Sequence, residues 1–585
     1  MYEVKSGIRM DVGITQWAQK SLEDNCRPLD VAAAVARKVA LQTGLPISNS
    51  APELLSCGDL VAPKGYEYRP ELVGAVYEQC LDSATRRNSG VHYTPIAVAQ
   101  GLTDIALSRA PRGPICDPAV GGGSFLLAAA NFYRQLDLHP STIVEELLWG
   151  IDVDPGAILV SQAVLALWAS DDHWICPEDH LVVADSLNEG VSAFSSPPAA
   201  GFTAVIGNPP FQNQLQEQTV RSLEATNSLR ERWSTSAGPY ADSAGFFLLA
   251  GVSMLADDGV LLMIQPQSFL SASDSSPIRQ ELEGKIDLAG MWLGGANIFE
   301  AGVHVCAPLF AFTKGESKLQ LWEGREVKES EPIERIKGEN WTEIISAVSG
   351  VPPVDLQGPE LGQMCSATAG FRDQFYGLKE YVSEKHLCTG ECAPLITVGM
   401  IDPFRNRWGK GTFRYANESW EEPFVDLQKL KRGNPELFNW VKDRLRPKVL
   451  VATQTKVLEV LPDPEGILVP STPVISVECD QENVWLVAAA LSSPALSARA
   501  FARAAGAAMS SDTLKLSATQ VTELPLPIRT HEWRKGAEYA KQAYFAKSAS
   551  SWVSCLKELG SQTTKAYGLE KNVLEWWSNR LPAWR

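Results

Sequence analysis

The stretch "IGNPPFQNQ" at residues 206–214 places an amide, two prolines and an aromatic ring directly behind the apolar run "FTAVI". The amine of an adenine ring is a poor nucleophile because its lone pair is delocalised, so two fixed hydrogen-bond acceptors would draw that nitrogen toward tetrahedral geometry. Asn208 and the carbonyl of Pro209 are candidate acceptors, Pro210 stiffens the turn, and Phe211 offers a stacking face. The chemistry that suits this pattern is transfer of a methyl group to such an amine, whereas an isolated Asn-Pro-Pro is also a plain turn.

A second group of candidates follows three predicted strands. The turn "CDPAVGGGSFL" holds Asp117 and the consecutive glycines 121–123, which allow a ligand close to the backbone at a helix start. The next strand ends "GIDVDP", where Asp152 is placed to accept the hydroxyls of a ribose, and the third ends "VVADS", where Asp185 can reach an exocyclic amine. Each feature alone also occurs as a helix-packing turn or a cap. Together they fit an adenosine that carries an amino acid.

These residues need a sheet to bring them together. Predicted strands alternate with predicted helices, in the order "GPICDPA", "FLLAAANFYRQL", "ELLWGIDVD", "PGAILVSQAVLALWA", "LVVADS" and "FTAVIGN". This alternation predicts a parallel, doubly wound sheet, in which all the turns above lie at the carboxyl edge. Further strands are expected at 285–295 and 305–315, with the sheet ending near Gly315.

The 585 residues are 45% hydrophobic and 21% charged, which allows several domains. The fold class we predict is α/β, with five segments. They are a helical N-terminal extension (1–85), a Rossmann-like catalytic domain (86–315), a connecting segment (316–360), an α+β recognition domain (361–528) and a helical tail (529–585). The longest apolar run, Phe246–Ala256, is shorter than the roughly 20 residues of a membrane span, so we expect a cytoplasmic chain without a membrane partner.

The net charge of -17 is unevenly distributed. Residues 361–585 hold 28 basic and 24 acidic side chains, against 24 and 45 in residues 1–360. Basic residues are densest in residues 399–456, interleaved with aromatic ones, which suits a phosphate backbone with nearby bases as well as an ordinary solvated surface. Arg405, Arg407 and Lys410 are the candidate DNA contacts. The 11 cysteines form no C-x-x-C pair, so we expect reduced thiols and no metal site.

At this point the chain resembles the gamma class of N6-adenine DNA methyltransferases, which bind S-adenosylmethionine and carry an Asn-Pro-Pro-aromatic motif on a Rossmann-like sheet. "SGVHYTP", with Thr94 and Pro95, is similar to the family motif that closes over the methionine end of the cofactor. "TAGFRDQFYG" and "VTELPLP" resemble the specificity domain of TaqI-like enzymes. The order of these motifs is the gamma order, with the catalytic domain first.

The resemblance implies a role for each candidate. Asp117, Ala119 and the turn Gly121 to Gly123 would hold the methionine part, Asp152 the ribose and Asp185 the adenine amine, while Asn208 to Phe211 would meet both the cofactor and the target base. "ANIFEAGVHVCAPLFAF" nominates Phe299 as a second base contact. The glycine turn and the Phe of the catalytic motif depart from the commoner family residues but keep the backbone donors and the ring.

The function implied is methylation of a flipped adenine in double-stranded DNA, in a restriction-modification or phage-defence setting with possible protein partners. Two alternatives use the same features. A protein glutamine methyltransferase presents an amide with the same motif, but such enzymes are shorter and lack a large basic second unit. A non-catalytic DNA-binding subunit would not need Asn208 and Asp152 intact.

Overall fold

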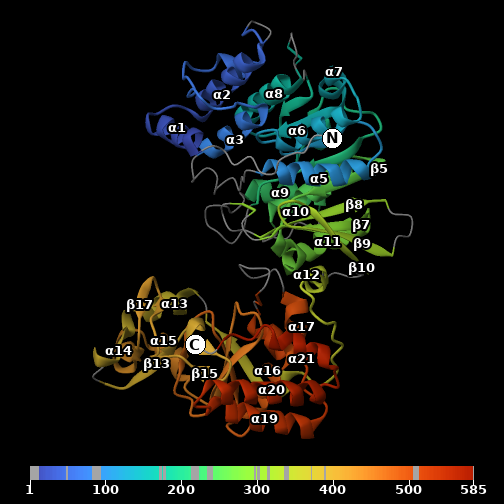
Figure 1. Ribbon diagram of the computed structural model, residues 1–585. Coiled ribbons are helices and arrows are strands. Elements are labelled where there is room, and N and C mark those ends of the chain that lie inside the picture. Colours follow the sequence, from blue (N-terminus) through green and yellow to red (C-terminus); the bar gives the residue numbers. More distant parts are fainter. Residues whose placement is uncertain are drawn as a thin grey trace. The chain divides into compact units, whose positions relative to one another are not determined.

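The computed structural model describes residues 12–47, 51–81, 94–169, 174–175, 179–211, 223–233, 242–295, 298–299, 304–312, 317–334, 341–370, 372–387, 390–504, 513–514 and 516–583. The chain divides into two compact units, Met1–Glu339 and Asn340–Arg585, which we call the N-terminal and C-terminal units. Figure 1 shows both, the first in blue to green and the second in yellow to red.

A mixed ten-stranded sheet forms the centre of the N-terminal unit, in the order β10-β9-β7-β8-β5-β4-β1-β2-β3, with β6 paired to β8. The five parallel strands are β1 (Ile115–Asp117), β2 (Leu148–Asp152), β3 (Leu181–Val183), β4 (Phe202–Gly207) and β5 (Leu255–Met263). The others are β6 (Gln265–Pro266), β7 (Asp287–Leu293), β8 (Val305–Ala311), β9 (Lys318–Glu323) and β10 (Lys328–Glu334). The strand order reverses between β1 and β4, which is where doubly wound sheets bind their ligands.

The sheet differs from the predicted one in two ways. Strand β8 runs antiparallel between β5 and β7, so the parallel run from β3 to β5 ends there, and β7 and β9 form a separate parallel pair. The prediction that the sheet ends near Gly315 is wrong, because β9 pairs with β7 and β10 pairs with β9. The predicted connecting segment therefore contains an edge hairpin, and its charged, alternating pattern is that of strands with one face in water.

The helices of the N-terminal unit cover the sheet. They are α5 (Ile96–Arg109), α6 (Ser124–Gln135), α7 (Pro140–Thr142), α8 (Pro155–Ala169), α9 (Leu223–Trp233), α10 (Ser243–Met254) and α11 (Ser276–Glu283). Gly123, with φ +83°, turns the chain from the glycine turn into α6. Helix α8 is apolar all round because it is buried between the sheet and further helices.

Those further helices are α1 (Val12–Glu23), α2 (Pro28–Thr43) and α3 (Pro70–Cys80), which confirm the helical nature of the N-terminal segment. Pro28 separates α1 from α2, since it holds Arg27 in an extended conformation. Val31, Val76 and Val164 share one hydrophobic core, so α2 and α3 pack directly on α8 rather than forming a separate extension. Figure 1 shows the three helices grouped beside α8.

The C-terminal unit is α+β, as predicted. It contains one sheet of β11 (Cys365–Ala369), β22 (Ile475–Cys479), β19 (Lys448–Ala452) and β20 (Glu459–Asp463), and another of β12 (Val382–Glu384), β18 (Pro423–Asp426), β13 (Cys392–Ile396) and β21 (Val469–Pro470). Short hairpins are formed by β14 (Ile401–Asp402) with β15 (Arg405–Asn406) and by β16 (Phe413–Tyr415) with β17 (Glu418–Trp420).

Helices fill the rest of this unit. They are α12 (Thr342–Val348), α13 (Arg372–Leu378), α14 (Leu427–Gly433), α15 (Pro435–Lys442), α16 (Val484–Leu491), α17 (Pro494–Ala504), α18 (Ala518–Thr522), α19 (Thr530–Tyr544), α20 (Ala549–Ala566) and α21 (Lys571–Ser578). The last three are the predicted helical tail, but they pack into the unit. Trp533 Nε1 donates to the Leu486 carbonyl of α16 at 2.8 Å, and Trp576 and Trp577 are buried.

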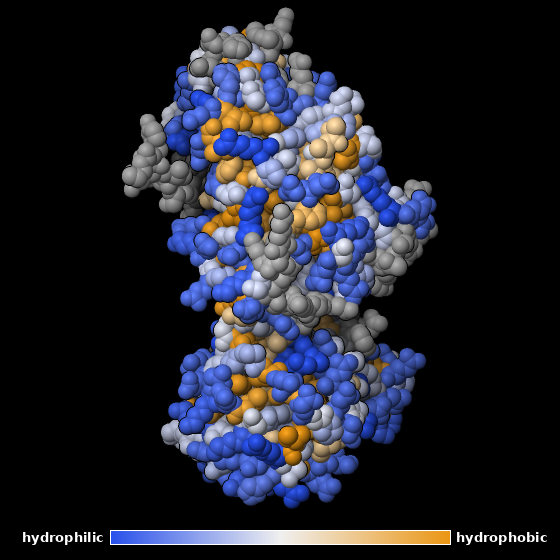
Figure 2. Space-filling view, turned by 90° about the vertical axis from the view of Figure 1, so that its right-hand side faces the viewer, coloured by the Kyte–Doolittle hydropathy of each residue, from blue (hydrophilic) through white to orange (hydrophobic). Residues whose placement is uncertain are grey.

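The surface and the thiols add two findings. Figure 2 shows hydrophobic side chains in separate areas among hydrophilic ones on the face it presents. Within the described ranges no single helix is long and apolar enough to cross a membrane, although the bent pair Val484–Leu491 and Pro494–Arg503 passes that test on length and composition. Eight described cysteines carry free thiols, but Cys392 is disulfide-bonded, so the expectation of reduced thiols is wrong there.

Candidate active site

The glycine turn after β1 keeps its own backbone donors occupied. Five consecutive N–H groups donate within the protein: Ala119 to Asp117 Oδ1 (3.0 Å), Val120 to the Ile151 carbonyl (3.0 Å), Gly121 to Asp152 Oδ2 (2.9 Å), Gly122 to Glu78 Oε1 (2.6 Å) and Gly123 to the Val120 carbonyl (2.9 Å). A turn built for phosphate would aim such groups at the ligand. Here three of them donate to carboxyl groups, which become negative when they ionise, so the turn suits a cationic ligand.

These three carboxyl groups lie in a poorly solvated place. Asp117 is 1% and Glu78 8% exposed, and Asp152 is half-buried. Burial, with repulsion from Asp152 and Glu78, raises the pKa of Asp117 to about 8, against the hydrogen bond from Ala119. Burial likewise raises the pKa of Glu78 to about 7 and raises the pKa of Asp152. Among the described residues no Lys or Arg forms an ion pair with any of them.

Asp152 and Asp185, which are predicted to hold the ribose and the adenine amine of the cofactor, lie at the turns after β2 and β3. Asp152 Oδ1 accepts from the backbone N–H of Asp154 at 2.9 Å, and Asp154 in turn accepts from the Tyr77 hydroxyl at 2.5 Å. Asp185 accepts from the N–H of Leu187 and from the Asn188 side chain. Ser186 Oγ donates to the Pro118 carbonyl at 2.6 Å, which ties the turn after β3 to the glycine turn.

The catalytic candidate Asn208 lies directly beside this acidic turn. A Cβ added to Gly207, the last residue of β4, would lie 2.4 Å from Asp117 Oδ1, so only glycine fits there. Asn208 Nδ2 donates to Thr94 Oγ1 at 2.9 Å, although 114 residues separate the two in sequence. This bond fixes which end of the carboxamide faces Thr94 and turns Oδ1 away from it. Thr94 and Pro95, which lie just before α5, are buried. Pro209, which follows Asn208 in the sequence, is also buried.

The two predicted base contacts also meet. The rings of Phe211 and Phe299 lie edge to face, with centroids 6.4 Å apart and an interplanar angle of 85°. Phe299 is 4% exposed, while Phe211 is half-buried and packs against the core of the unit. Both aromatic residues therefore line the same place behind β4. The part of "IGNPPFQNQ" from Gln212 onward lies outside the described residues.

Sequence reasoning missed α3. Its residues Gly74, Tyr77 and Glu78 contact the turns after β1 and β2, although the predicted catalytic domain began at residue 86. A Cβ on Gly74 would lie 2.1 Å from the Gly122 carbonyl. The sequence signal was Glu78, which lies at helical spacing from the apolar residues of "ELVGAVYEQC". A glutamate on a solvent-exposed helix face would not fall among these apolar positions.

In the C-terminal unit the three candidate DNA contacts differ. Arg405 Nη1 and Arg407 Nε lie 3.8 and 3.7 Å from Asp402 Oδ2, and their side chains are only 11% and 20% exposed. Lys410 is exposed. The structure therefore gives the two arginines partners within the fold, and Lys410 alone of the three projects into solvent.

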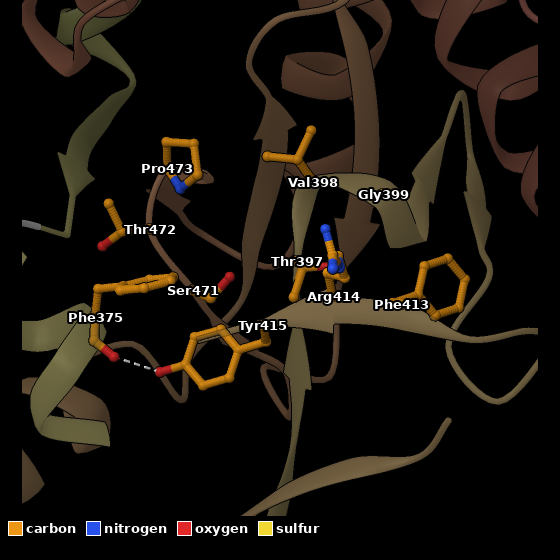
Figure 3. Close-up of a pocket in the computed structure, with 10 residues that line it drawn as sticks. All are labelled: Phe375, Thr397, Val398, Gly399, Phe413, Arg414, Tyr415, Ser471, Thr472 and Pro473. Carbon is orange, nitrogen blue, oxygen red and sulfur yellow. Dashed lines mark hydrogen bonds between the residues drawn. The ribbon is translucent and has the colours of Figure 1, made fainter. Parts of the chain in front are cut away.

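The same stretch borders a cavity of about 340 Å³, shown in Figure 3. Its lining combines aromatic rings, hydroxyl groups and one guanidinium, from Phe375, Thr397, Val398, Gly399, Phe413, Arg414, Tyr415, Ser471, Thr472 and Pro473. The Tyr415 hydroxyl donates to the Phe375 carbonyl at 2.6 Å, which fixes one wall, and Phe413 lies at the opposite end. Arg414 is exposed and Ser471 is buried.

The family model described as N-6 DNA Methylase matches residues 69–349. This segment is therefore similar to the N-6 DNA methylase family. The match begins immediately before α3 and includes β9 and β10, so it covers all the strands of the sheet.

Individual relatives are distant. The chain is 22% identical over 214 residues, 37% of its length, to the type II methyltransferase M.VspI of Vibrio sp. (strain 343). It is 28% identical over 125 residues, 21% of its length, to the type II methyltransferase M.XamI of Xanthomonas campestris pv. amaranthicola. The matched parts span 46% and 20% of these relatives, less than half of either.

Two solved structures share the fold. The type IIL restriction-modification enzyme MmeI in complex with DNA aligns with a TM-score of 0.60 at 12% identity, over 88% of this chain and 81% of that one. A DrdV–DNA complex aligns with a TM-score of 0.50 at 13% identity, over 81% and 59%. These likenesses confirm the predicted α/β methyltransferase fold with a second unit.

Proposed function

We propose that this chain is a DNA methyltransferase that transfers a methyl group from S-adenosylmethionine to the N6 amine of an adenine in double-stranded DNA. The observation that carries the proposal is the position of Asn208. It stands at the end of β4, oriented by Thr94, with its backbone neighbour Gly207 against Asp117 of the acidic glycine turn. A methyl acceptor held by Asn208 would thus meet a cofactor held by that turn.

The residues of the turn fit the cofactor. S-adenosylmethionine supplies a methyl group on a sulfonium sulfur and carries a second positive charge on its amine. Asp117, Asp152 and Glu78 are three carboxylates without a basic partner among the described residues, and a bound cation would stabilise their ionised forms. Asp152 lies at the strand end where a ribose is held, and Asp185 at the next one.

Asn208 and Pro209 act on the amine. Oδ1 of Asn208 and the carbonyl of Pro209 accept its two N–H groups, so that the nitrogen lone pair points at the methyl carbon. S-adenosylmethionine held at the glycine turn would supply the methyl group, while Asn208 and Pro209 would hold the amine as one of its protons passes to water. Because the proline ring fixes the backbone, neither acceptor needs to reorganise as charge develops.

Phe211 and Phe299 would receive the base. An adenine inside a duplex must be flipped out, which costs a few kcal/mol that the pocket has to offset. The two rings are in edge-to-face contact, so a base that stacks between them requires at least one ring to turn. Stacking on either face then replaces the contact that the rings lose.

The C-terminal unit would choose the DNA sequence, and the motif order supports the gamma class with a TaqI-like specificity domain at residues 361–528. The basic stretch 399–456 and the cavity bordered by Arg414 support DNA contact there. DNA is present in the solved structures of MmeI and DrdV. A restriction-modification setting agrees with MmeI, which is a restriction-modification enzyme.

The test incubates the purified protein and methyl-labelled S-adenosylmethionine with unmodified genomic DNA and, separately, with a protein extract, and then separates the labelled nucleosides and amino acids. We expect the label in N6-methyladenine at one short sequence motif. Label in protein glutamine would instead support a protein methyltransferase, and cofactor binding with no labelled product would support a non-catalytic DNA-binding subunit.

A further inference from the structure

One face of α3 contacts two of the turns that follow the strands. Gly74, Tyr77 and Glu78 stand at positions i, i+3 and i+4, which share a helix face. Glu78 Oε1 accepts the Gly122 N–H at 2.6 Å, and Tyr77 donates its hydroxyl to Asp154 Oδ2 at 2.5 Å. The first contact is with the turn after β1 and the second with the turn after β2.

This face of α3 packs tightly against both turns. A Cβ on Gly74 would lie 2.1 Å from the Gly122 carbonyl, and one on Gly122 would lie 2.8 Å from Glu78 Oε1. A Cβ on Gly156, the second residue of α8, would lie 2.3 Å from the Tyr77 hydroxyl. The helix therefore sets the position of both backbones and not only their hydrogen bonds.

The other side chains of α3 already anchor it. Leu72, Val73 and Val76 lie in the core shared with α2 and α8, so packing alone would hold the helix in place. A buried carboxylate adds a desolvation cost to such a helix unless the charge has a use. Glu78, whose pKa burial raises to about 7, bears that cost at the turn where a ligand is expected.

We propose that the face of α3 formed by Gly74, Tyr77 and Glu78 is a positioning element of the cofactor site. It holds the glycine turn and the Asp152 turn in the register that S-adenosylmethionine requires. Glu78 and Tyr77 act through the Gly122 amide and Asp154, and they are positioning residues. The choice of ligand rests on the proposed function, whereas the fixing of the turns does not.

The experiment compares Glu78→Ala, Glu78→Gln and Tyr77→Phe with the control Tyr68→Phe. Tyr68 is a buried tyrosine of the same core whose hydroxyl donates to the Pro63 carbonyl at 2.9 Å, away from both turns. Calorimetry measures S-adenosylmethionine affinity, and amide hydrogen exchange of a peptide spanning residues 118–127 measures how firmly the turn is held without ligand.

Glu78→Ala and Tyr77→Phe should weaken cofactor binding by about 10- to 100-fold, the range of a lost hydrogen bond to a charged group. Glu78→Ala should also speed exchange in the peptide, which contains Gly122. Glu78→Gln keeps an acceptor for Gly122, so it should restore exchange protection while its affinity stays between those of Ala and the wild type. Tyr68→Phe should change neither quantity.

Equal behaviour of Tyr77→Phe and Tyr68→Phe in both measurements would overturn the proposal, because α3 would then be structural only. A wild-type chain that binds no S-adenosylmethionine would instead count against the proposed function, and the exchange data would still decide whether α3 fixes the turn. If Glu78→Ala does not fold, Glu78→Gln and Tyr77→Phe still decide it.

Discussion

The two units differ in the partners of their buried charged side chains. In the C-terminal unit, Lys448 Nζ lies 2.5 Å from Asp463 Oδ2 with both side chains buried, and Arg405 and Arg407 flank Asp402. In the N-terminal unit, the carboxyl groups of Asp117, Asp152 and Glu78 surround the glycine turn. Among the described residues they accept hydrogen bonds from backbone N–H groups and form no ion pair with a basic side chain. Paired charges support a fold, whereas a buried cluster of one sign costs free energy until a ligand of the opposite sign arrives.

We infer from this contrast that the N-terminal unit carries out the chemistry and that the buried charged residues of the C-terminal unit support its fold.

Asn208→Ala should lower the rate of methyl transfer by about 100- to 1000-fold, the usual cost of one preorganised group that acts at the transition state. Cofactor and DNA binding should persist, because the change leaves the acidic turn and the C-terminal unit intact. Single-turnover methylation of a duplex with the target site measures the rate, and calorimetry and DNA titration measure binding. A rate equal to the wild type would mean that another group activates the amine.

Phe211→Ala should lose about 1 to 3 kcal/mol of base binding, since each stacked base contributes about that much. Phe211→Tyr keeps the ring and should remain active, which makes it the matched control. Fluorescence of 2-aminopurine at the target position reports the flipped base. If Ala and Tyr flip the base equally well, the aromatic face is not used.

Lys410→Glu should reduce the slope of DNA affinity against salt by about one unit, because an exposed cation near the duplex displaces about one counterion. Lys20→Glu, an exposed lysine of α1, is the control and should leave the slope unchanged. Arg405→Glu should instead lower the unfolding temperature, since it sets a carboxylate beside buried Asp402. An unchanged slope in Lys410→Glu would place the phosphates elsewhere.

The sequence predicted the strands β1 to β4 and the turns behind them, because Gly, Pro and Asp at strand ends are local signals. It also predicted that Asn208 and Thr94, and Phe211 and Phe299, belong to one site. It did not predict that the glycine turn keeps its donors for Asp117, Asp152 and Glu78, since that pairing needs three segments far apart in the chain. Nor could it separate Arg405 from Lys410, because a burial difference within ten residues depends on Asp402 and on Trp552, whose ring lies 5.8 Å from the Arg405 guanidinium.

The edge hairpin of β9 and β10 shows a second limit. Its residues are charged and its loop is turn-like, so composition alone resembles a linker. The pairing of β9 with buried β7 comes from Leu319 and Leu321, which alternate with polar residues and face the core. Two apolar positions are too few to distinguish an edge strand from a connection by pattern.

The acidic turn can be tested most directly by comparing S-adenosylmethionine affinity in the wild type and in Asp117→Asn as pH rises. Asn keeps the shape and the acceptor for Ala119 and removes only the titratable charge. Asp117 has a folded pKa of about 8, far above the value near 4 of an unfolded chain. Its protonated form therefore stabilises the ligand-free protein at low pH, and that stability is lost as pH rises through about 8.

A cationic ligand should bind the ionised form better, so the ratio of wild-type to Asp117→Asn affinity should rise by up to about tenfold per pH unit below pH 8 and then level off. The ratio cancels the titration of the cofactor itself. Calorimetry across this range, with ATP as a phosphate ligand that should not bind, gives the result. A ratio that stays constant with pH, or binding of ATP in place of S-adenosylmethionine, would contradict the account of the glycine turn as a site for a cationic cofactor.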